Sequence, residues 1–123
     1  MTKSILAAIA AILLELSAVR AGEGRLSLAV GAAQAIEFVE NPSTGYVWRF
    51  DRAASENPAI VRVGEGGFTP SGGEPDRPLV GAPGQRHFRV EAVAAGRARL
   101  VFVEERPWEK RPVQRRSVEI LAR

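Results

Sequence analysis

Beyond residue 21, apolar and polar residues alternate in short runs that are separated by glycine, proline and other turn residues. A two-residue period is typical of β-strands with one buried face, because successive side chains of a strand point to opposite sides. The pattern predicts strands at about residues 26–30, 36–38, 46–50, 60–63, 87–93, 97–105 and 113–121. No segment of this part keeps a helical apolar period over three turns, so we predict an all-β domain.

Seven short strands in roughly 100 residues, with a tryptophan in the third, are typical of an immunoglobulin-like antiparallel β-sandwich. We therefore expect about seven or eight strands, with Trp48 filling the centre of the core. Because the chain has no cysteine, packing alone must hold the two sheets together. Successive connections in such a sandwich alternate between its two ends. This places residues 41–45, 64–84 and 106–109 at one end, and residues 31–33, 51–58 and 95–96 at the other.

The first 21 residues follow a different pattern. Lys3 precedes an unbroken apolar run over residues 5–14, and Val19 and Ala21 are small residues at positions −3 and −1 of a cleavage site after Ala21. These features predict a secretory signal peptide over 1–21 and one domain over 22–123. The run is too short for a transmembrane anchor, which needs about 20 apolar residues, and it is apolar on every face, unlike an amphipathic helix. We expect a periplasmic or secreted protein with no stable membrane insertion after cleavage.

Composition excludes several classes of function. Without residues 1–21, which hold Lys3, Arg20 and Glu15, the formal net charge of +3 becomes +2, and the arginines are scattered. We therefore expect no nucleic-acid partner. The absence of cysteine excludes disulfides, thiol catalysis and cysteine-ligated zinc, and a single histidine argues against a histidine-rich metal site. We expect no metal and no cofactor.

The first connection at the unusual end, residues 41–45, reads Asn-Pro-Ser-Thr-Gly. Pro42 fixes its own φ and favours an extended Asn41, while Gly45 permits a positive φ. Ser43 and Thr44 can form hydrogen bonds with nearby backbone. We expect a stiff tip from which two hydroxyl groups project, although these residues alone would also suit an ordinary turn.

The other two connections at this end are also unusual. Residues 106–109 carry a tryptophan, which is costly to expose at a loop tip unless a partner covers it. Arg106 and Trp108 are of the types most enriched in interface hot spots, and Pro107 limits the entropy lost on docking. The alternative is that Trp108 folds back onto the edge of the sandwich. Residues 64–84 are rich in Gly and Pro, and they are either functional or contain strand residues that the pattern does not reveal.

Together these connections resemble the signature loops of the chagasin family, which inhibits papain-like cysteine proteases. Residues 41–46 followed by Trp48, residues 81–84 before His87-Phe88, and residues 106–108 carry the resemblance, in the family's order. It implies a reversible, non-covalent inhibitor and a papain-like cysteine protease as partner, with the inhibitor a monomer. Residues 43–45 would lie over the catalytic Cys–His pair, Trp108 on the primed side, and residues 79–84 on the non-primed side. The implied protease-binding residues are Asn41, Pro42, Ser43, Thr44, Gly45, Tyr46, Leu79, Val80, Gly81, Ala82, Pro83, Gly84, Arg106, Pro107 and Trp108.

Two residues depart from the family pattern. The family usually has Thr in place of Ser43, and the missing methyl group should weaken contact modestly. It tends to have Gly in place of Pro83, which removes a backbone N–H group but stiffens the loop.

Two other functions stay open. A non-inhibitory immunoglobulin-like module for an exported protein or a glycan could stack Tyr46 and Trp108 on a sugar ring. An enzyme is the third hypothesis, but His87 is expected on an outward strand face between arginines. Glu104 and Glu105 should point to opposite faces, so they could not act jointly as acid and base.

Overall fold

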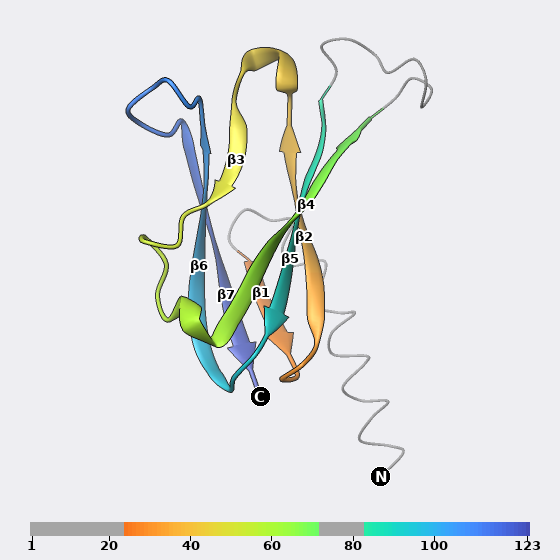
Figure 1. The fold of residues 1–123 in the computed structure, drawn as a ribbon, viewed down its shortest axis with the longest axis vertical. Coiled ribbons are helices and arrows are strands. Elements are labelled where there is room, and N and C mark those ends of the chain that lie inside the picture. Colours follow the sequence, from red (N-terminus) through yellow and green to blue (C-terminus); the bar gives the residue numbers. More distant parts are fainter. Residues whose placement is uncertain (1–23, 72–82) are drawn as a thin grey trace.

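A computed structural model describes residues 24–71 and 83–123, and these residues form two packed β-sheets (Figure 1). The four-stranded sheet has the order β1-β7-β6-β3, and the three-stranded sheet has the order β2-β5-β4. The strands are β1 (Gly24–Leu28), β2 (Ala33–Glu40), β3 (Val47–Phe50), β4 (Val61–Pro70), β5 (Gly84–Ala92), β6 (Gly96–Glu105) and β7 (Gln114–Ala122). The predicted all-β sandwich is confirmed. No helix in the described ranges is long and apolar enough to cross a membrane.

One strand pair departs from the antiparallel arrangement that we expected. β1 pairs with β7 in parallel, from Gly24 beside Val118 to Leu28 beside Ala122. The short connection after β1 crosses from one sheet to the other, so β1 and β2 run in opposite directions in different layers. Because successive strands alternate in direction, the first and the seventh strand run the same way. They are neighbours in one sheet, so their pairing is parallel.

The core between the sheets is a cluster of aromatic rings surrounded by aliphatic side chains. Trp48 is 6% exposed and stacks on Phe38 with ring centroids 4.5 Å apart. Phe102, from the opposite sheet to Phe38 and Phe88, lies 5.0 Å and 4.9 Å from their rings. Such contacts add to the burial of apolar area. The expected place of Trp48 in the core is confirmed.

β4 is longer than the sequence pattern predicts. It continues from the predicted 60–63 segment through Gly64, Glu65, Gly66 and Gly67 to Pro70, and it stays paired with β5 throughout. The register shifts between Glu65 and Gly67, and Gly67 has a φ of +86°. At a bulge of this kind a strand can contain glycines, including one with a positive φ, that the sequence pattern assigns to a loop. The predicted 64–84 connection therefore shortens to residues 71–83.

Three connections gather at one end of the sandwich, as the alternation of strands predicts. They join β2 to β3, β4 to β5, and β6 to β7, and the described parts of all three lie at the upper end of Figure 1. The backbone N–H of Ser71 donates to the carbonyl oxygen of Pro83 at 3.2 Å, which closes the base of the second connection.

Candidate functional site

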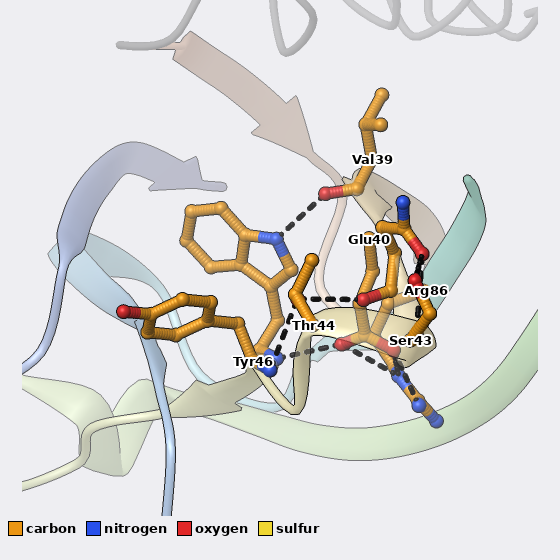
Figure 2. A network of polar contacts seen from close by, with 8 residues as sticks. Val39, Glu40, Ser43, Thr44, Tyr46 and Arg86 are labelled. Atoms are coloured by element: carbon orange, nitrogen blue, oxygen red, sulfur yellow. Dashed lines mark hydrogen bonds and ion pairs between the residues drawn. The ribbon is translucent and has the colours of Figure 1, made fainter. Parts of the chain in front are cut away.

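The β2–β3 connection is a single braced turn. Residues Pro42–Thr44 form a short 3-10 helix between an extended Asn41 and Gly45, whose φ is +81°. The Asn41 side chain accepts hydrogen bonds from the Ser43 backbone at 3.1 Å and the Ser43 hydroxyl at 2.7 Å (Figure 2). The Thr44 hydroxyl donates to the Asn41 carbonyl at 2.8 Å and accepts from the Tyr46 N–H at 3.2 Å. The predicted stiffness is confirmed, but both hydroxyl groups brace the turn instead of projecting freely.

A buried carboxylate supports this turn from below. Glu40, 1% exposed, ends β2 on its inner face and accepts the backbone N–H of Trp48 at 2.7 Å. Its other oxygen accepts from Arg86 Nη2 at 2.6 Å, and Figure 2 shows both residues beside the turn. A buried carboxylate requires such a charged partner. The Glu40 contacts tie β2, β3 and β5 together where the turn begins.

Sequence reasoning did not identify Glu40. A signal was present, because Ile36, Phe38 and Glu40 share the inner face of one strand and the first two are core residues. A carboxylate on that face indicates a buried ion pair.

A second carboxylate lies close to this pair. Glu104 on β6 stands opposite Trp48 in the register of the four-stranded sheet. Burial, followed by the negative charge of Glu40, raises the pKa of Glu104, while Arg116 acts in the opposite direction. Two carboxylates therefore share the region beneath the turn with Arg86 and Arg116.

The β6–β7 connection lies against the first turn. Arg106 Nε donates to the carbonyl oxygen of Thr44 at 2.9 Å, and its guanidinium lies 4.1 Å from the centre of the Tyr46 ring. A Cβ atom on Gly45 would lie 2.7 Å from Cη2 of Trp108. Arg106 and Trp108 thus join two connections that are about 60 residues apart in sequence.

Trp108 itself faces solvent. It is 71% exposed, although one edge of its ring touches the first turn. The alternative that it folds back into the sandwich edge is wrong. Pro107 beside it and the turn residues Pro42, Ser43 and Thr44 are also exposed. The result is a continuous, protruding surface made of one indole and a rigid turn.

The structure describes the two ends of the second connection. Pro83 is exposed, and Gly84 is buried as the first residue of β5. A Cβ atom on Gly84 would lie 2.4 Å from the Phe68 ring and from the carbonyl oxygen of Thr69. The remaining predicted site residues, Leu79, Val80, Gly81 and Ala82, lie outside the described residues.

The titratable residues considered for catalysis lie away from this surface. His87 lies on the outer face of β5, and its ring contacts the Thr69 hydroxyl at 2.8 Å and a Glu37 carboxylate oxygen at 3.4 Å. Glu105 pairs with Arg49 at 3.1 Å on the outer face of the other sheet, whereas Glu104 points inward. The expected orientations are confirmed. Within residues 24–71 and 83–123, no group of three side chains could hold a metal ion.

The chain is similar to one family of proteins over most of its length. The sequence model of the chagasin family peptidase inhibitor I42 matches residues 27–120. Chagasin from Trypanosoma cruzi is 36% identical over 85 residues, which is 68% of this chain and 73% of chagasin.

Solved structures support the fold. The cysteine protease inhibitor EhICP2 from Entamoeba histolytica superposes with a TM-score of 0.61 at 21% identity, covering 85% of this chain and 89% of that one. PbICP-C, solved in complex with falcipain-2, gives a TM-score of 0.56 at 18% identity, covering 82% and 88%.

Proposed function

Because the chain belongs to the chagasin family of peptidase inhibitors, we propose that its three adjacent loops fill the active-site cleft of a papain-like cysteine protease. Family membership makes the protein a peptidase inhibitor and not an enzyme. The partner class is supported by the relative PbICP-C, which was solved in complex with falcipain-2. Inhibition of this kind is reversible and non-covalent, since it relies on occupancy of the cleft.

The observation that carries the proposal is the exposed Trp108 held against a braced turn. An exposed indole is a strong anchor for a protein partner, because it buries much apolar area and loses little conformational entropy. The turn beside it has its hydroxyl groups and backbone already hydrogen-bonded. A loop that is ordered before binding loses less entropy when it docks.

Each loop has a proposed position in the cleft. Residues 43–45 lie over the catalytic Cys–His pair, and Trp108 packs against aromatic residues on the primed side. Residues 79–84 follow the non-primed side and pair backbone groups with the enzyme. Arg106 holds the first and third loops in a fixed relation through Thr44 and Tyr46.

Titration of papain with the folded protein tests the proposal, and we expect loss of activity to a stoichiometric endpoint. Trp108→Ala should weaken inhibition roughly 30-fold, as for a hot spot worth about 2 kcal/mol, mainly through faster dissociation. Its thermal midpoint should stay nearly unchanged, because Trp108 is exposed. Val113→Ala, which truncates another exposed residue of the same connection, is the control.

Two results would contradict the proposal. One is a folded protein that inhibits none of several papain-like enzymes. The other is an equal loss of affinity in Trp108→Ala and Val113→Ala, which would mean that Trp108 is not an anchor. Binding of a glycan without any protease would favour a non-inhibitory binding module.

We further propose that the protein acts outside the cytoplasm. The apolar run over residues 5–14 and the small residues before position 22 support export through a cleaved signal peptide. The N-terminus of the protein purified from its producing cell should be Gly22, as measured by intact mass. A mass that includes Met1 to Ala21 would contradict export by cleavage.

A further inference from the structure

The two outer faces of the sandwich differ in charge. The outer face of the four-stranded sheet carries five arginines and two glutamates, an excess of three positive charges: Arg25, Arg49, Arg97, Arg99, Arg115, Glu105 and Glu119. On the three-stranded sheet, the arginines are balanced by glutamates: Arg62, Arg89, Glu37 and Glu91. Of the two outer faces, the face of the four-stranded sheet is therefore the one with an excess of positive charge.

Two neighbouring arginines on this face, Arg97 and Arg99, take part in none of the ion pairs of the described residues, although Glu119 and Glu56 stand beside Arg99 in the strand pairing. Glu119 pairs with Arg25 at 3.5 Å, and Glu105 pairs with Arg49 at 3.1 Å. Neither Arg97 nor Arg99 forms an ion pair with a described residue, and Arg99 has only a 3.5 Å contact with the Ser117 hydroxyl. They are two residues apart on β6, so both side chains point outward about 7 Å from each other.

The two arginines line a shallow groove at the end of the sandwich away from the candidate loops. The groove has a volume of about 860 Å³. Its charged lining consists of four arginines and two glutamates, an excess of two positive charges: Arg25, Arg97, Arg99, Arg123, Glu56 and Glu119. β6 begins beside Arg97 and ends at Glu105, where the third loop starts. A ligand in the groove would therefore leave Trp108 accessible.

We propose that this groove binds a linear acidic polysaccharide, sulfated or carboxylated, through Arg97 and Arg99. Guanidinium groups form paired hydrogen bonds with the oxygens of sulfate and carboxylate groups. A chain with regularly spaced anions can meet both arginines without any apolar anchor. Such binding would hold the inhibitor at an anionic matrix while its loops stay free, and it does not depend on the proposed inhibition.

Other anionic partners fit the face less well. At the groove, β6 pairs with β7 on one side, and on the other side Arg99 exchanges two backbone hydrogen bonds with Glu56, so an acidic peptide could not add to it as a further strand. Duplex DNA is usually read by an element that projects into a groove, and single strands are usually bound by stacking on aromatic rings. The described residues that line this groove include no aromatic side chain.

The test measures binding to heparin, used as a linear sulfated probe, at low salt. Arg97→Ser/Arg99→Ser should bind heparin roughly fivefold more weakly, as expected for two exposed charge contacts, and should elute at lower salt. Arg62→Ser/Arg89→Ser removes the same charge from the opposite face and should bind like the parent. All four side chains are exposed, so both variants should fold, which thermal unfolding verifies.

Three results would overturn the proposal. They are no binding of the parent to heparin, equal weakening in both double variants, and tighter binding to polyglutamate or duplex DNA than to heparin. Papain titration separates this proposal from the inhibitory one. Arg97→Ser/Arg99→Ser should inhibit papain like the parent, whereas Trp108→Ala should bind heparin like the parent.

Discussion

Gly45 shows how one residue links the shape of a turn to the position of a binding side chain. Its φ of +81° suits glycine, and a Cβ atom there would meet Trp108 at 2.7 Å. Gly31, at the opposite end, has a φ of +92°, but its Cβ atom would meet nothing within 4 Å. Replacing either glycine with alanine would therefore strain the backbone, but only at Gly45 would the new Cβ atom also clash with Trp108.

We expect Gly45→Ala and Gly31→Ala to lose similar stability, about 1–2 kcal/mol each, because both place a side chain in the left-handed region. Only Gly45→Ala should displace Trp108 and weaken papain inhibition, by roughly tenfold or more. Denaturant unfolding and inhibition assays measure the two effects separately. Equal inhibition by both variants would show that the Trp108 position does not matter.

At single residues, the sequence predicts the backbone conformation where proline or glycine restricts or permits particular φ values. The extended Asn41 and the positive φ of Gly45 follow from proline and glycine chemistry. The contacts of Arg106 with Thr44 and Tyr46 could not be predicted, because they depend on how two distant connections meet. The alternation in β2 indicates that Glu40 faces inward, but its partner could not be predicted, because Arg86 lies on another strand.

At the level of elements, β4 shows the limit of reading strands from alternation. Alternation reports which face is buried, and this edge strand buries little beyond residue 63. The length of β4 is determined by its backbone hydrogen bonds to β5, and these do not depend on which side chains the strand carries. The central strands, whose inner faces are buried, were predicted to within about three residues.

The close contact between β4 and β5 leads to a prediction for Gly84. A Cβ atom there would lie 2.4 Å from the Thr69 carbonyl oxygen, which cannot move without disturbing the strand pairing. We expect Gly84→Ala to destabilise the fold by about 1–3 kcal/mol in denaturant unfolding. Gly64→Ala on β4, where a Cβ atom would meet nothing within 4 Å, is the control. A loss of stability as small as that of Gly64→Ala would contradict the close contact.

At the scale of the whole molecule, the sheets are joined by an aromatic core and, beneath the loops, by a polar cluster. Phe38 and Phe88 from one sheet meet Phe102 from the other. Near the loops, Glu40 contacts β3 and β5, and Glu104 lies near it on β6. The core was predictable from hydrophobic pattern. The polar cluster was not, because it combines single residues from four strands.

This cluster makes stability depend on pH in a defined direction. Burial and the charge of Glu40 raise the pKa of Glu104, so the folded chain binds this proton more tightly than the unfolded chain. Ionisation of Glu104 therefore costs stability at neutral pH, and this cost disappears as the pH falls through the raised pKa towards the ordinary glutamate value.

Glu104→Gln removes that cost, since the amide stays neutral at every pH. We expect its thermal midpoint to exceed that of the parent at about pH 7.5, with the difference shrinking towards about pH 4.5. Glu65→Gln, on the exposed part of β4, is the control, because it changes the net charge equally without approaching Glu40. A midpoint for Glu104→Gln below that of the parent at about pH 7.5 would mean that attraction to Arg116 outweighs burial and the repulsion from Glu40. The carboxylate would then stabilise the end of the sandwich that carries Trp108.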